Sequence, residues 1–282
     1  MIIGIDIGST TTKAVSIEAV PGPGGGAQNA GRVIHRIKTK AADAVTSAAG
    51  AFGKMLLENH IKMEDIQRVM ITGAGSAKMK SDLFGIPTRR VNEIQAIGIG
   101  GMYLAGKDNI IITNVGTGTV IIDARSSGRI SHLGGSGVGG GTILGLAKKL
   151  LSTSDFNDVM ALAETGSLNR VDLLLEDIME TDLSFLKPEA TVSNFGKMQD
   201  GAGLEDIALG IVSMVYQVIG VLSAFAARSR NTNRVVVTGN GSKNSVGKRI
   251  LTAIEEMYAV RFEYPSDAEY TTAIGAGLYP LE

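Results

Sequence analysis

Apolar runs and apolar periodicities alternate along most of this chain. Short runs rich in isoleucine and valine, such as residues 2–7 and 110–115, predict buried strands, because β-branched side chains suit a pleated surface. Elsewhere, as at residues 41–59 and 245–258, apolar side chains recur every three or four positions, which is typical of helices that cover a sheet. The alternation of strands with helices predicts an α/β fold.

The same pattern gives the remaining expected elements. Strands are predicted at residues 2–7, 11–17, 32–38, 67–72, 88–91, 110–115, 120–122, 128–133, 234–238 and 260–264. Helices are predicted at residues 41–59, 93–104, 143–151, 155–165, 170–180, 207–227, 245–258 and 271–278. The Gly/Pro-rich residues 20–31 form either a mobile lid or a long exposed turn, and residues 182–203 are irregular.

Two segments repeat one pattern, in which an apolar strand runs into a tight turn of glycine, serine and threonine and then into a second strand. The turns read Asp-Ile-Gly-Ser-Thr-Thr-Thr-Lys at residues 6–13 and Asn-Val-Gly-Thr-Gly-Thr at residues 114–119. Either turn alone could be an ordinary hairpin. Their repetition indicates an internal duplication and two related lobes. Such turns offer backbone N–H groups and hydroxyls without Cβ bulk, which suits a polyphosphate held between the lobes.

Other glycine-rich turns lie next to predicted helices. Residues 134–141 precede an apolar helix, and residues 72–76 follow a strand, so both could hold a ligand at a helix N-terminus. Residues 239–242 follow a late strand, where a flat base can lie against the backbone. Residues 135–140 formally satisfy the dinucleotide-binding fingerprint, but the preceding strand belongs to a hairpin series and not to a parallel βαβ unit. Residues 241–249 lack the spacing of a Walker A loop.

Glu93 stands where a predicted strand gives way to a helix. The carboxyl ends of strands in open α/β sheets face the ligand crevice, so this carboxylate could act as a general base on a substrate hydroxyl. An acidic residue in a first helical turn is equally favoured by the helix dipole, without any chemistry. Position alone leaves both interpretations open.

Residues 207–227 are free of charge and long enough to raise the question of a membrane span. Ser213, Gln217 and Ser223 lower the hydropathy of this segment, and no basic flanking loops accompany it. We therefore expect a fully buried core helix or a helix at a subunit interface, and no membrane partner.

Composition narrows the remaining classes. A chain of 282 residues with 44% hydrophobic residues can bury a sizeable core, and its length suits two domains. A formal net charge of -1 without long basic runs argues against a nucleic-acid partner. The absence of cysteine excludes disulfides, thiolate metal sites and a cysteine nucleophile, and it fits a reducing cytoplasm. The first residues lack the basic segment of a signal peptide, so we expect a cytoplasmic protein.

The two hairpin motifs and the Thr-Gly-Asn-Gly-Ser turn at residues 238–242 resemble those of the actin/Hsp70/sugar-kinase superfamily. More narrowly, Asn-Val-Gly-Thr-Gly-Thr, the glycine run with its following helix, and Asn-Phe-Gly-Lys-Met at residues 194–198 resemble the type II pantothenate kinases. The similarity covers nearly the whole chain. It implies a two-lobed, ribonuclease H-like fold with duplicated mixed sheets flanked by helices, an N-terminal lobe at residues 1–106 and a C-terminal lobe at residues 107–282.

The resemblance also implies residue roles, with ATP and Mg²⁺ as cofactors. Asp6 would orient Mg²⁺ and water, and Glu93 would be the base. Together with the glycine turns described above, the expected nucleotide-binding residues are Gly8, Ser9, Thr10, Lys13, Gly116, Thr117, Gly118, Thr119, Gly139, Gly140, Gly141, Gly239, Gly241 and Ser242. The residues expected at the acceptor are Thr72, Gly73, His132 and Gly135.

One position departs from the family pattern. His132 stands where the family has an arginine just before the apolar residue that leads into the glycine run. That arginine is expected to hold the carboxylate of pantothenate or nearby oxygens, whereas histidine is shorter and only partly charged at neutral pH. The substrate is therefore less firmly implied than the type of reaction.

The expected function is an ATP-dependent kinase that phosphorylates the primary hydroxyl of pantothenate, the first step of coenzyme A biosynthesis. The family further implies a homodimer and inhibition by coenzyme A or its thioesters at the nucleotide site. The alternatives are a sugar or N-acetylhexosamine kinase of the same superfamily and a non-kinase ATP-driven switch. The activators of 2-hydroxyacyl-CoA dehydratases are such switches, but they ligate an iron–sulfur cluster through cysteine, which this chain lacks.

Overall fold

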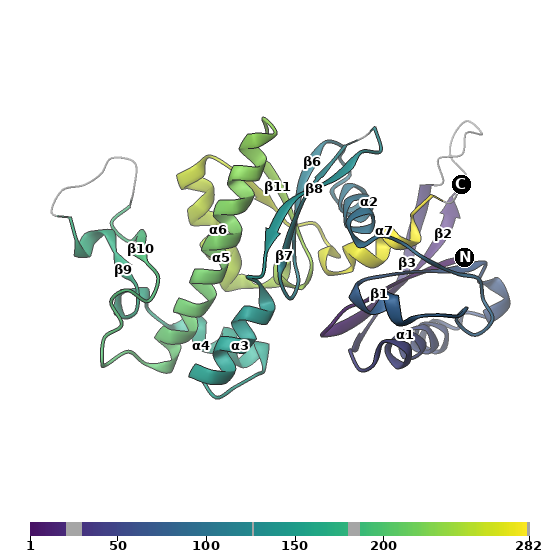
Figure 1. Cartoon of the computed structure of the whole chain (residues 1–282), viewed down its shortest axis with the longest axis horizontal. Helices are drawn as coiled ribbons and strands as arrows, with labels where there is room; N and C mark the ends of the chain where they lie inside the picture. Colours follow the sequence, from purple (N-terminus) through teal and green to yellow (C-terminus); the bar gives the residue numbers. More distant parts are fainter. Residues whose placement is uncertain (21–29, 126, 180–186, 281–282) are drawn as a thin grey trace.

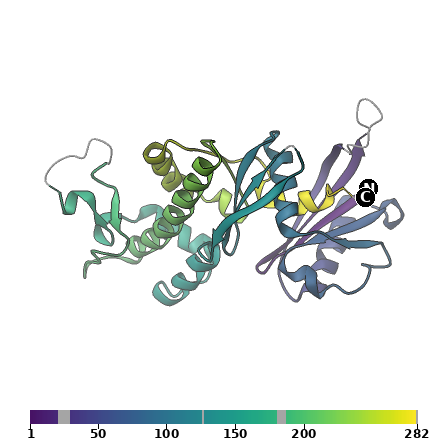
Figure 2. The same cartoon turned by 45° about the horizontal axis from the view of Figure 1, so that its top comes forward.

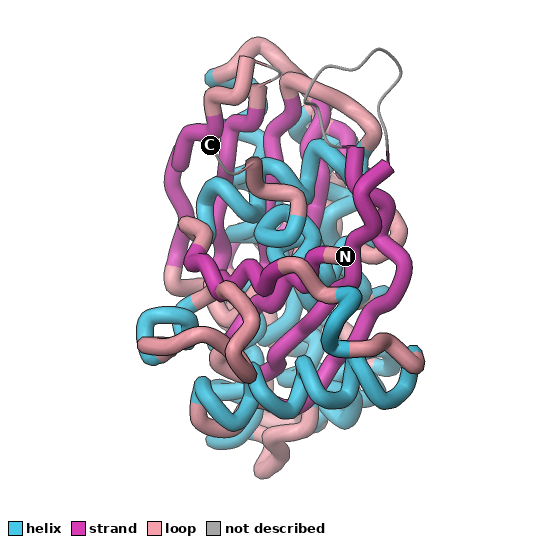
Figure 3. Tube along the Cα trace, turned by 90° about the vertical axis from the view of Figure 1, so that its right-hand side faces the viewer, coloured by secondary structure: helices cyan, strands magenta, loops and turns pink. Residues whose placement is uncertain are grey.

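A computed structural model describes residues 1–20, 30–125, 127–179 and 187–280. Most of the glycine-rich loop expected at residues 20–31 lies outside these ranges, so neither interpretation of it is tested. Two five-stranded sheets form the two halves of the molecule, with α2 (Glu93–Ala105) and α7 (Thr271–Gly277) between them (Figure 1). Both chain ends lie on the side of the first sheet, as a view from that side also shows (Figure 3).

The first sheet has the strand order β3-β2-β1-β4-β5. Its strands are β1 (Ile2–Ile7), β2 (Thr11–Val20), β3 (Ala30–Lys40), β4 (Arg68–Thr72) and β5 (Thr88–Arg90). β1, β2 and β3 form an antiparallel meander, and β4 and β5 add to β1 as parallel strands. Ile3, Ile5 and Ile7 of β1 are buried, and α1 (Ala44–Asn59) covers one face of the sheet with Phe52 and Met55.

The second sheet repeats this plan. Its order is β12-β11-β6-β7-β8, built from β6 (Ile110–Val115), β7 (Thr119–Ala124), β8 (Ile130–Ser136), β11 (Arg234–Thr238) and β12 (Arg261–Glu263). β6, β7 and β8 form the antiparallel meander, and β11 and β12 add in parallel. The identical topology confirms the predicted duplication of mixed sheets. Because β7 and β8 are antiparallel, residues 135–140 do not lie in the parallel unit that a dinucleotide fingerprint requires.

Helices of the second half enclose the largest apolar core. α5 (Leu204–Ser229) runs along the sheet and packs against α3 (Gly140–Leu150), α4 (Phe156–Thr165) and α6 (Ser245–Tyr258), as the tilted view shows (Figure 2). Its side chains at Ile211, Val212, Val215 and Ile219 are fully buried. α5 is the one described helix with the length and composition of a membrane span, yet 67% of its most apolar window is buried inside the protein. Most of this helix is thus buried, as expected, and its place at a subunit interface stays a prediction.

Each of the two helices between the sheets packs on the sheet formed by the other half of the chain. α2 follows the last strand of the first sheet but packs Ile97 against Ile110, Ile112 and Ile122 of the second. α7 follows the second sheet, yet its Ala273 and Ile274 pack against Val15 and Ile17 of the first. Each sheet is therefore covered by a helix from the other half, and the proposed division between residues 106 and 107 stays a prediction.

Three local expectations were wrong. No α-helix spans residues 170–179, where short 3₁₀ turns at Leu168–Arg170 and Leu175–Asp177 flank β9 (Leu173–Leu174), which pairs with β10 (Thr191–Ser193). The segment is held instead by Asp172, a fully buried carboxylate that accepts hydrogen bonds from Phe195 N and the Thr191 hydroxyl. Such tertiary hydrogen bonds override a helical apolar period. The turn after β4 leads into a 3₁₀ segment, Ala74–Lys78, and β8 extends into the glycine run.

Candidate functional site

The turns of the two hairpins meet at the boundary between the halves. The Ser9 and Thr117 hydroxyl oxygens lie 2.8 Å apart, which is a hydrogen bond between the first turn and the second. Beside it, Asn240 Nδ2 donates to Thr11 Oγ1 at 3.3 Å. The two turns therefore meet in the structure, as predicted.

Two adjoining cavities open at this point. The smaller, of about 280 Å³, is lined by Asp6, Gly8, Ser9, Thr10, Thr11, Lys13, Gly73, Ala74, Glu93, Asn114, Gly116, Thr117, Gly118, Thr119, Val120, Ser136, Gly239, Asn240 and Thr272. The larger, of about 470 Å³, is lined by Thr10, Thr11, Lys38, Val115, Gly116, Thr117, Gly140, Gly141, Leu144, Phe156, Asn157, Met160, Tyr216, Asn240, Gly241, Lys243, Asn244, Ser245 and Glu269. The residues shared by the two walls, including Thr10, Thr11 and Thr117, mark the junction where an elongated ligand would pass from one to the other.

Asp6 and Lys13 face each other in the smaller cavity. Asp6 lies on β1 directly opposite Lys13 of β2, and their residues are only 9% and 6% exposed. Burial raises the pKa of Asp6, and the charge of Lys13 opposes that rise. Burial lowers the pKa of Lys13, and Asp6 opposes that fall. The pair thus lies in a poorly solvated site, where the charges of an incoming ligand act strongly.

Glu93 is the first residue of α2 and shares the wall of the smaller cavity with Asp6. The preceding Asn92 caps the helix, its side chain accepting from Ile94 N at 2.9 Å and from Gln95 N, so the start of α2 is fixed. Glu93 is nevertheless exposed to solvent. The surrounding protein raises its pKa by desolvation, and the charge of Asp6 adds to the rise. A carboxylate with a raised pKa at a cavity wall is a candidate general base.

The backbone at Gly73 lies close to the side chain of Asp6. Its φ of +83° lies in the region that favours glycine, and a Cβ there would lie 2.5 Å from Asp6 Oδ1. Thr72, the other residue expected at the acceptor on this loop, is fully buried and does not line either cavity.

The glycine run supports the second hairpin turn through its backbone. Gly140 N donates to Gly116 O and Gly141 N donates to Thr117 O, both at 2.9 Å. A Cβ at Gly139 would lie 2.7 Å from Thr117 O, so the helix start can approach the turn only with glycine there. Gly140 and Gly141 line the larger cavity, whereas Gly139 lies behind the turn and lines neither. Sequence reasoning expected all three at the nucleotide.

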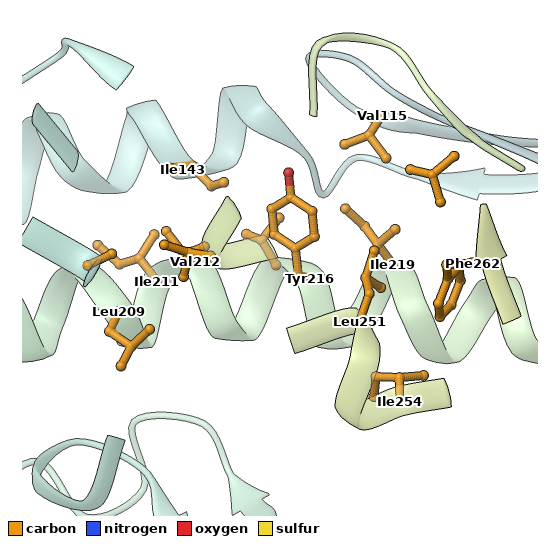
Figure 4. Close-up of a cluster of buried hydrophobic side chains, with 14 of the residues drawn as sticks. Val115, Ile143, Leu209, Ile211, Val212, Tyr216, Ile219, Leu251, Ile254 and Phe262 are labelled. Carbon is orange, nitrogen blue, oxygen red and sulfur yellow. The ribbon is translucent and has the colours of Figure 1, made fainter. Parts of the chain in front are cut away.

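Apolar side chains contribute to the wall of the larger cavity. Leu144, Phe156 and Met160 line it together with Gly241, a combination that suits a flat ring. Tyr216 rises from α5 between Val212 and Ile219 (Figure 4) and donates its hydroxyl to Gly241 O at 2.8 Å. Burial raises the pKa of Tyr216 to about 12, so it remains a neutral donor that fixes the glycine turn. Ser242 is buried and donates to Gly239 O, so it shapes this turn from beneath.

Gly135 and His132 lie on β8. Gly135 pairs with Val120, and a Cβ on it would lie 2.3 Å from Thr119 O, so it too lets backbone approach the second turn. His132 is exposed and pairs with Ile122 on the neighbouring strand. Neither residue is among those that line the two cavities, and their roles at the acceptor stay predictions.

Several wall residues had no signal in the sequence. Lys38, Tyr216, Lys243 and Glu269 line the cavities but belong to none of the motifs expected to bind ligand. Asn114 and Asn240 lie inside the motifs at residues 114–119 and 238–242, but the sequence did not mark them as site residues. Strand register brings Lys38 next to Lys13, and helix packing brings Tyr216 under Gly241. Both depend on contacts between residues far apart in the chain.

A metal ion at this site would rely on oxygen atoms of the nucleotide. The described residues contain no group of three or more histidine, aspartate or glutamate side chains that could hold a metal. Asp6 supplies one buried carboxylate in the smaller cavity. This donor set fits Mg²⁺, which is commonly bound by one or two carboxylates, phosphate oxygens and water.

Known protein families match both halves of the chain. The Fumble family matches residues 107–255, and the BadF/BadG/BcrA/BcrD ATPase family matches residues 3–154. A type II pantothenate kinase of Bacillus cereus is 31% identical over 77% of this chain and 82% of its own length. That of Bacillus anthracis is 32% identical over 76% of this chain and 81% of its own.

Solved structures share the fold at lower identity. An ADPNP-bound activator of the 2-hydroxyisocaproyl-CoA dehydratase from Clostridium difficile superimposes with a TM-score of 0.68 at 19% identity, covering 98% of this chain and 92% of that one. A ROK hexokinase from Thermus thermophilus has a TM-score of 0.56 at 13% identity, covering 98% of this chain and 97% of the hexokinase.

These similarities agree with the duplicated mixed sheets, and both Bacillus relatives named above are type II pantothenate kinases. The protein is accordingly an ATP-binding kinase with a small-molecule substrate. With a relative above 30% identity that is covered over most of its length, the chain belongs to the type II pantothenate kinase family of the actin-like ATPase superfamily.

Proposed function

We propose that this kinase transfers the γ-phosphoryl group of ATP to the primary hydroxyl of pantothenate, as the first step of coenzyme A biosynthesis. The observation that carries the proposal is the shared wall of the smaller cavity, where Glu93 and Asp6 lie beside both hairpin turns. Phosphoryl transfer needs a positioned acceptor, a proton acceptor and neutralisation of phosphate charge, and these residues can supply all three. The family membership supports the same reaction.

Each residue has a distinct part in this reaction. Glu93 accepts the proton of the acceptor hydroxyl, for which a raised pKa is an advantage near neutral pH. The backbone and hydroxyls of Gly8, Ser9, Gly116 and Thr117 hold the phosphates between the hairpins, and Lys13 balances their charge. Closure of the halves around the ligand excludes water, which limits wasteful hydrolysis.

Mg²⁺ would accompany the nucleotide into the smaller cavity. Asp6 would hold it, directly or through water, together with oxygens of the bound phosphates. When bound, the ion neutralises charge that develops on the transferred group. The chain's own residues then position the acceptor and move its proton.

The identity of the acceptor rests on the family. His132 replaces the arginine expected to hold the carboxylate of pantothenate, and it is exposed on β8. Thr72, Gly73 and Gly135 are the other residues proposed for the acceptor side. The alternative is a sugar or N-acetylhexosamine kinase, and the similarity to the ROK hexokinase bears on the fold alone at 13% identity.

An ADP-release screen over pantothenate, pantetheine, glucose and N-acetylglucosamine tests the proposal. We expect ADP release to depend on pantothenate or pantetheine, and mass spectrometry should find a phosphate ester in the product. If only a hexose stimulates ADP release, the acceptor is a hexose and not pantothenate. Release without any acceptor dependence would indicate an ATP-driven switch.

The proposed function extends to the oligomeric state of the protein and to its inhibition. We propose a cytoplasmic homodimer in which α5 contributes to the interface, and inhibition by coenzyme A or its thioesters in competition with ATP. α5 supports the dimer because Met214 and Val218 remain partly exposed and Phe225 is 52% exposed on an otherwise buried helix. Competition with ATP is measured as an increase in the apparent KM for ATP when coenzyme A is added.

A further inference from the structure

A row of charged side chains crosses the first sheet between the two cavities. Asp6 on β1 lies opposite Lys13 on β2, and Lys13 lies opposite Lys38 on β3. Directly opposed residues of antiparallel strands project from the same face, with Cβ atoms about 5 Å apart. The three side chains therefore stand side by side. Asp6 and Lys13 both belong to the first hairpin motif, whereas Lys38 joins the row through strand pairing.

The outer end of the row is fixed by the other half of the protein. Lys38 Nζ lies 2.8 Å from Glu269 Oε2, and Glu269 also pairs with Lys243. Glu269 is 5% exposed and lies in the 3₁₀ turn Ala268–Tyr270, just before α7. This buried carboxylate holds the Lys38 ammonium at the wall of the larger cavity while leaving two of its three protons free to bind something else.

The charges of Lys13 and Lys38 are only partly balanced by the neighbouring carboxylates. Like charges directly opposite each other in a sheet are destabilising. The described part of the chain offers Lys13 Nζ no hydrogen bond or ion pair within ordinary distance, and Lys38 shares the single carboxylate of Glu269 with Lys243. Together Asp6, Lys13, Lys38, Glu269 and Lys243 carry three positive and two negative charges. An anion between the two opposed lysines would relieve their repulsion.

The pair also stands at the junction of the cavities. Lys13 lines the smaller cavity and Lys38 lines the larger, whereas Thr10 and Thr11 line both. A nucleotide whose ring lies in the larger cavity and whose terminal phosphate reaches Asp6 must cross this junction with its inner phosphates. The two lysines, one on each side of the junction, are well placed to bind these negatively charged inner phosphates.

We infer that Lys38 is a phosphate-binding residue of the nucleotide site, which together with Lys13 clamps the phosphates nearest the ribose while Glu269 positions it. The inference rests on the ATP-dependent activity proposed above but not on the identity of the acceptor. It goes beyond the hairpin motifs, because β3 contributes no residue to them. The ligand class is a nucleoside 5′-diphosphate or triphosphate, and adenosine without phosphate gains nothing from the clamp.

Calorimetric binding of ADP and of adenosine to the full chain, without acceptor, tests this assignment. Lys38→Met removes the charge and keeps most of the side-chain length. We expect the ADP affinity to fall roughly tenfold or more, as for loss of a hydrogen bond to a charged group, while the adenosine affinity stays within about twofold. Lys38→Arg should retain most of the ADP affinity.

Arg36→Met is the matched control. Arg36 lies two residues before Lys38 on the same face of β3 and forms a similar ion pair with Asp267 at 2.8 Å, but it lines neither cavity. If Lys38 were merely structural, both variants would lower the melting temperature and would change ADP and adenosine binding alike. That result, or an unchanged ADP affinity in Lys38→Met, overturns the inference.

Two further results bear on the inference. If Lys38→Met does not fold, Lys38→Gln is measured in the same way and carries the same expectation. If the wild-type protein and Lys38→Met bind ADP equally well, Lys38 does not bind the phosphates, but the proposed kinase activity is unaffected. A wild-type protein that binds neither ADP nor ATP overturns the kinase proposal itself, and the clamp with it.

Discussion

Gly275 of α7 lies against Gly100 of α2 so closely that a Cβ on Gly275 would stand 2.7 Å from the Gly100 backbone nitrogen. The same Cβ would lie 1.7 Å from the carbonyl oxygen of Ala96, a distance that no side chain can adopt. The helices that link the two sheets therefore touch backbone to backbone. α2 also carries Glu93 at its first position, so this crossing sets where the proposed base stands.

Gly275→Ala should therefore destabilise the protein strongly. The added methyl group forces α2 and α7 apart, and overpacking of this kind costs about 2–3 kcal/mol or more. Differential scanning calorimetry should show a melting temperature lower by roughly 5 °C or more. Gly53→Ala, inside α1 with nothing within 4 Å of the added Cβ, is the control and should gain up to about 1 kcal/mol from helix propensity. Equal effects of the two changes would contradict close packing at the crossing.

Much of this architecture could be predicted from the sequence because its signals are local. The hairpins at β1–β2 and β6–β7 follow from isoleucine runs that break at glycine and threonine, and the repetition of that pattern predicts the duplication. The exchange of α2 and α7 between the sheets leaves no such signal, since both read as ordinary helices. Lys38 and Glu269 are 231 residues apart in the chain, and their approach follows only from the assembled fold.

The helix predicted at residues 170–180 was wrong for the same reason, because contacts with residues elsewhere in the chain decide the conformation. Its apolar residues keep a helical spacing, but Asp172 lies among them and is satisfied by Phe195, Thr191 and Asn194 from a distant segment. A buried carboxylate takes the backbone conformation that brings its partners within reach. Periodicity alone does not contain those partners, so it cannot predict which interaction decides the conformation.

Glu93→Gln should keep ATP binding and lose phosphoryl transfer. The change removes the proposed base while nearly preserving shape, and general bases contribute about 10²–10⁴-fold to rate. Turnover is measured by ADP release with the best acceptor, and ATP binding by calorimetry. Glu205→Gln removes an acidic residue from the first turn of α5, away from both cavities, and serves as the control. If Glu93→Gln kept more than roughly a third of wild-type turnover, the base would lie elsewhere.

The raised pKa of Glu93 predicts the pH dependence of that turnover. Desolvation, and then the charge of Asp6, favour the protonated form, so the carboxylate becomes a base only at a pH above its ordinary value of 4.5. The rate should therefore rise with pH through an acidic limb whose midpoint lies above 4.5, with one proton lost. In Glu93→Gln the residual rate should lack that limb. An identical limb in the variant would assign it to another group.

Asp6→Asn should weaken the Mg²⁺ dependence of the reaction far more than the binding of the acceptor. Asp6 is the buried carboxylate next to both hairpin turns, and Mg²⁺ strongly prefers charged oxygen ligands. Titration of Mg²⁺ at saturating ATP should give a higher half-saturating concentration and a lower maximal rate. Calorimetry of the acceptor should change little. An equal loss of acceptor affinity would place Asp6 in acceptor binding instead.

The last prediction concerns α5 and the proposed dimer. One side of this helix forms the core of the second half, but Met214 and Val218 are partly exposed. Leu222 is also partly exposed although it contacts that core, and Phe225 is more fully exposed. Their spacing of three or four residues forms one stripe along the helix. A stripe of this kind on an otherwise buried helix suits an interface between two copies, because obligate interfaces resemble a core cut in half.

Val218→Asp and Val221→Asp should separate interface from core. Val221 packs against the apolar cluster of the second half, so an unpaired charge there should unfold the protein. Val218 lies outside that cluster, so Val218→Asp should instead yield a folded protein of half the mass by light scattering at micromolar concentration. Val45→Asp, on an exposed position of α1, should leave the mass unchanged. A wild-type protein that is monodisperse, fully active and monomeric would contradict the dimer, because the stripe would then be stable in water without a partner.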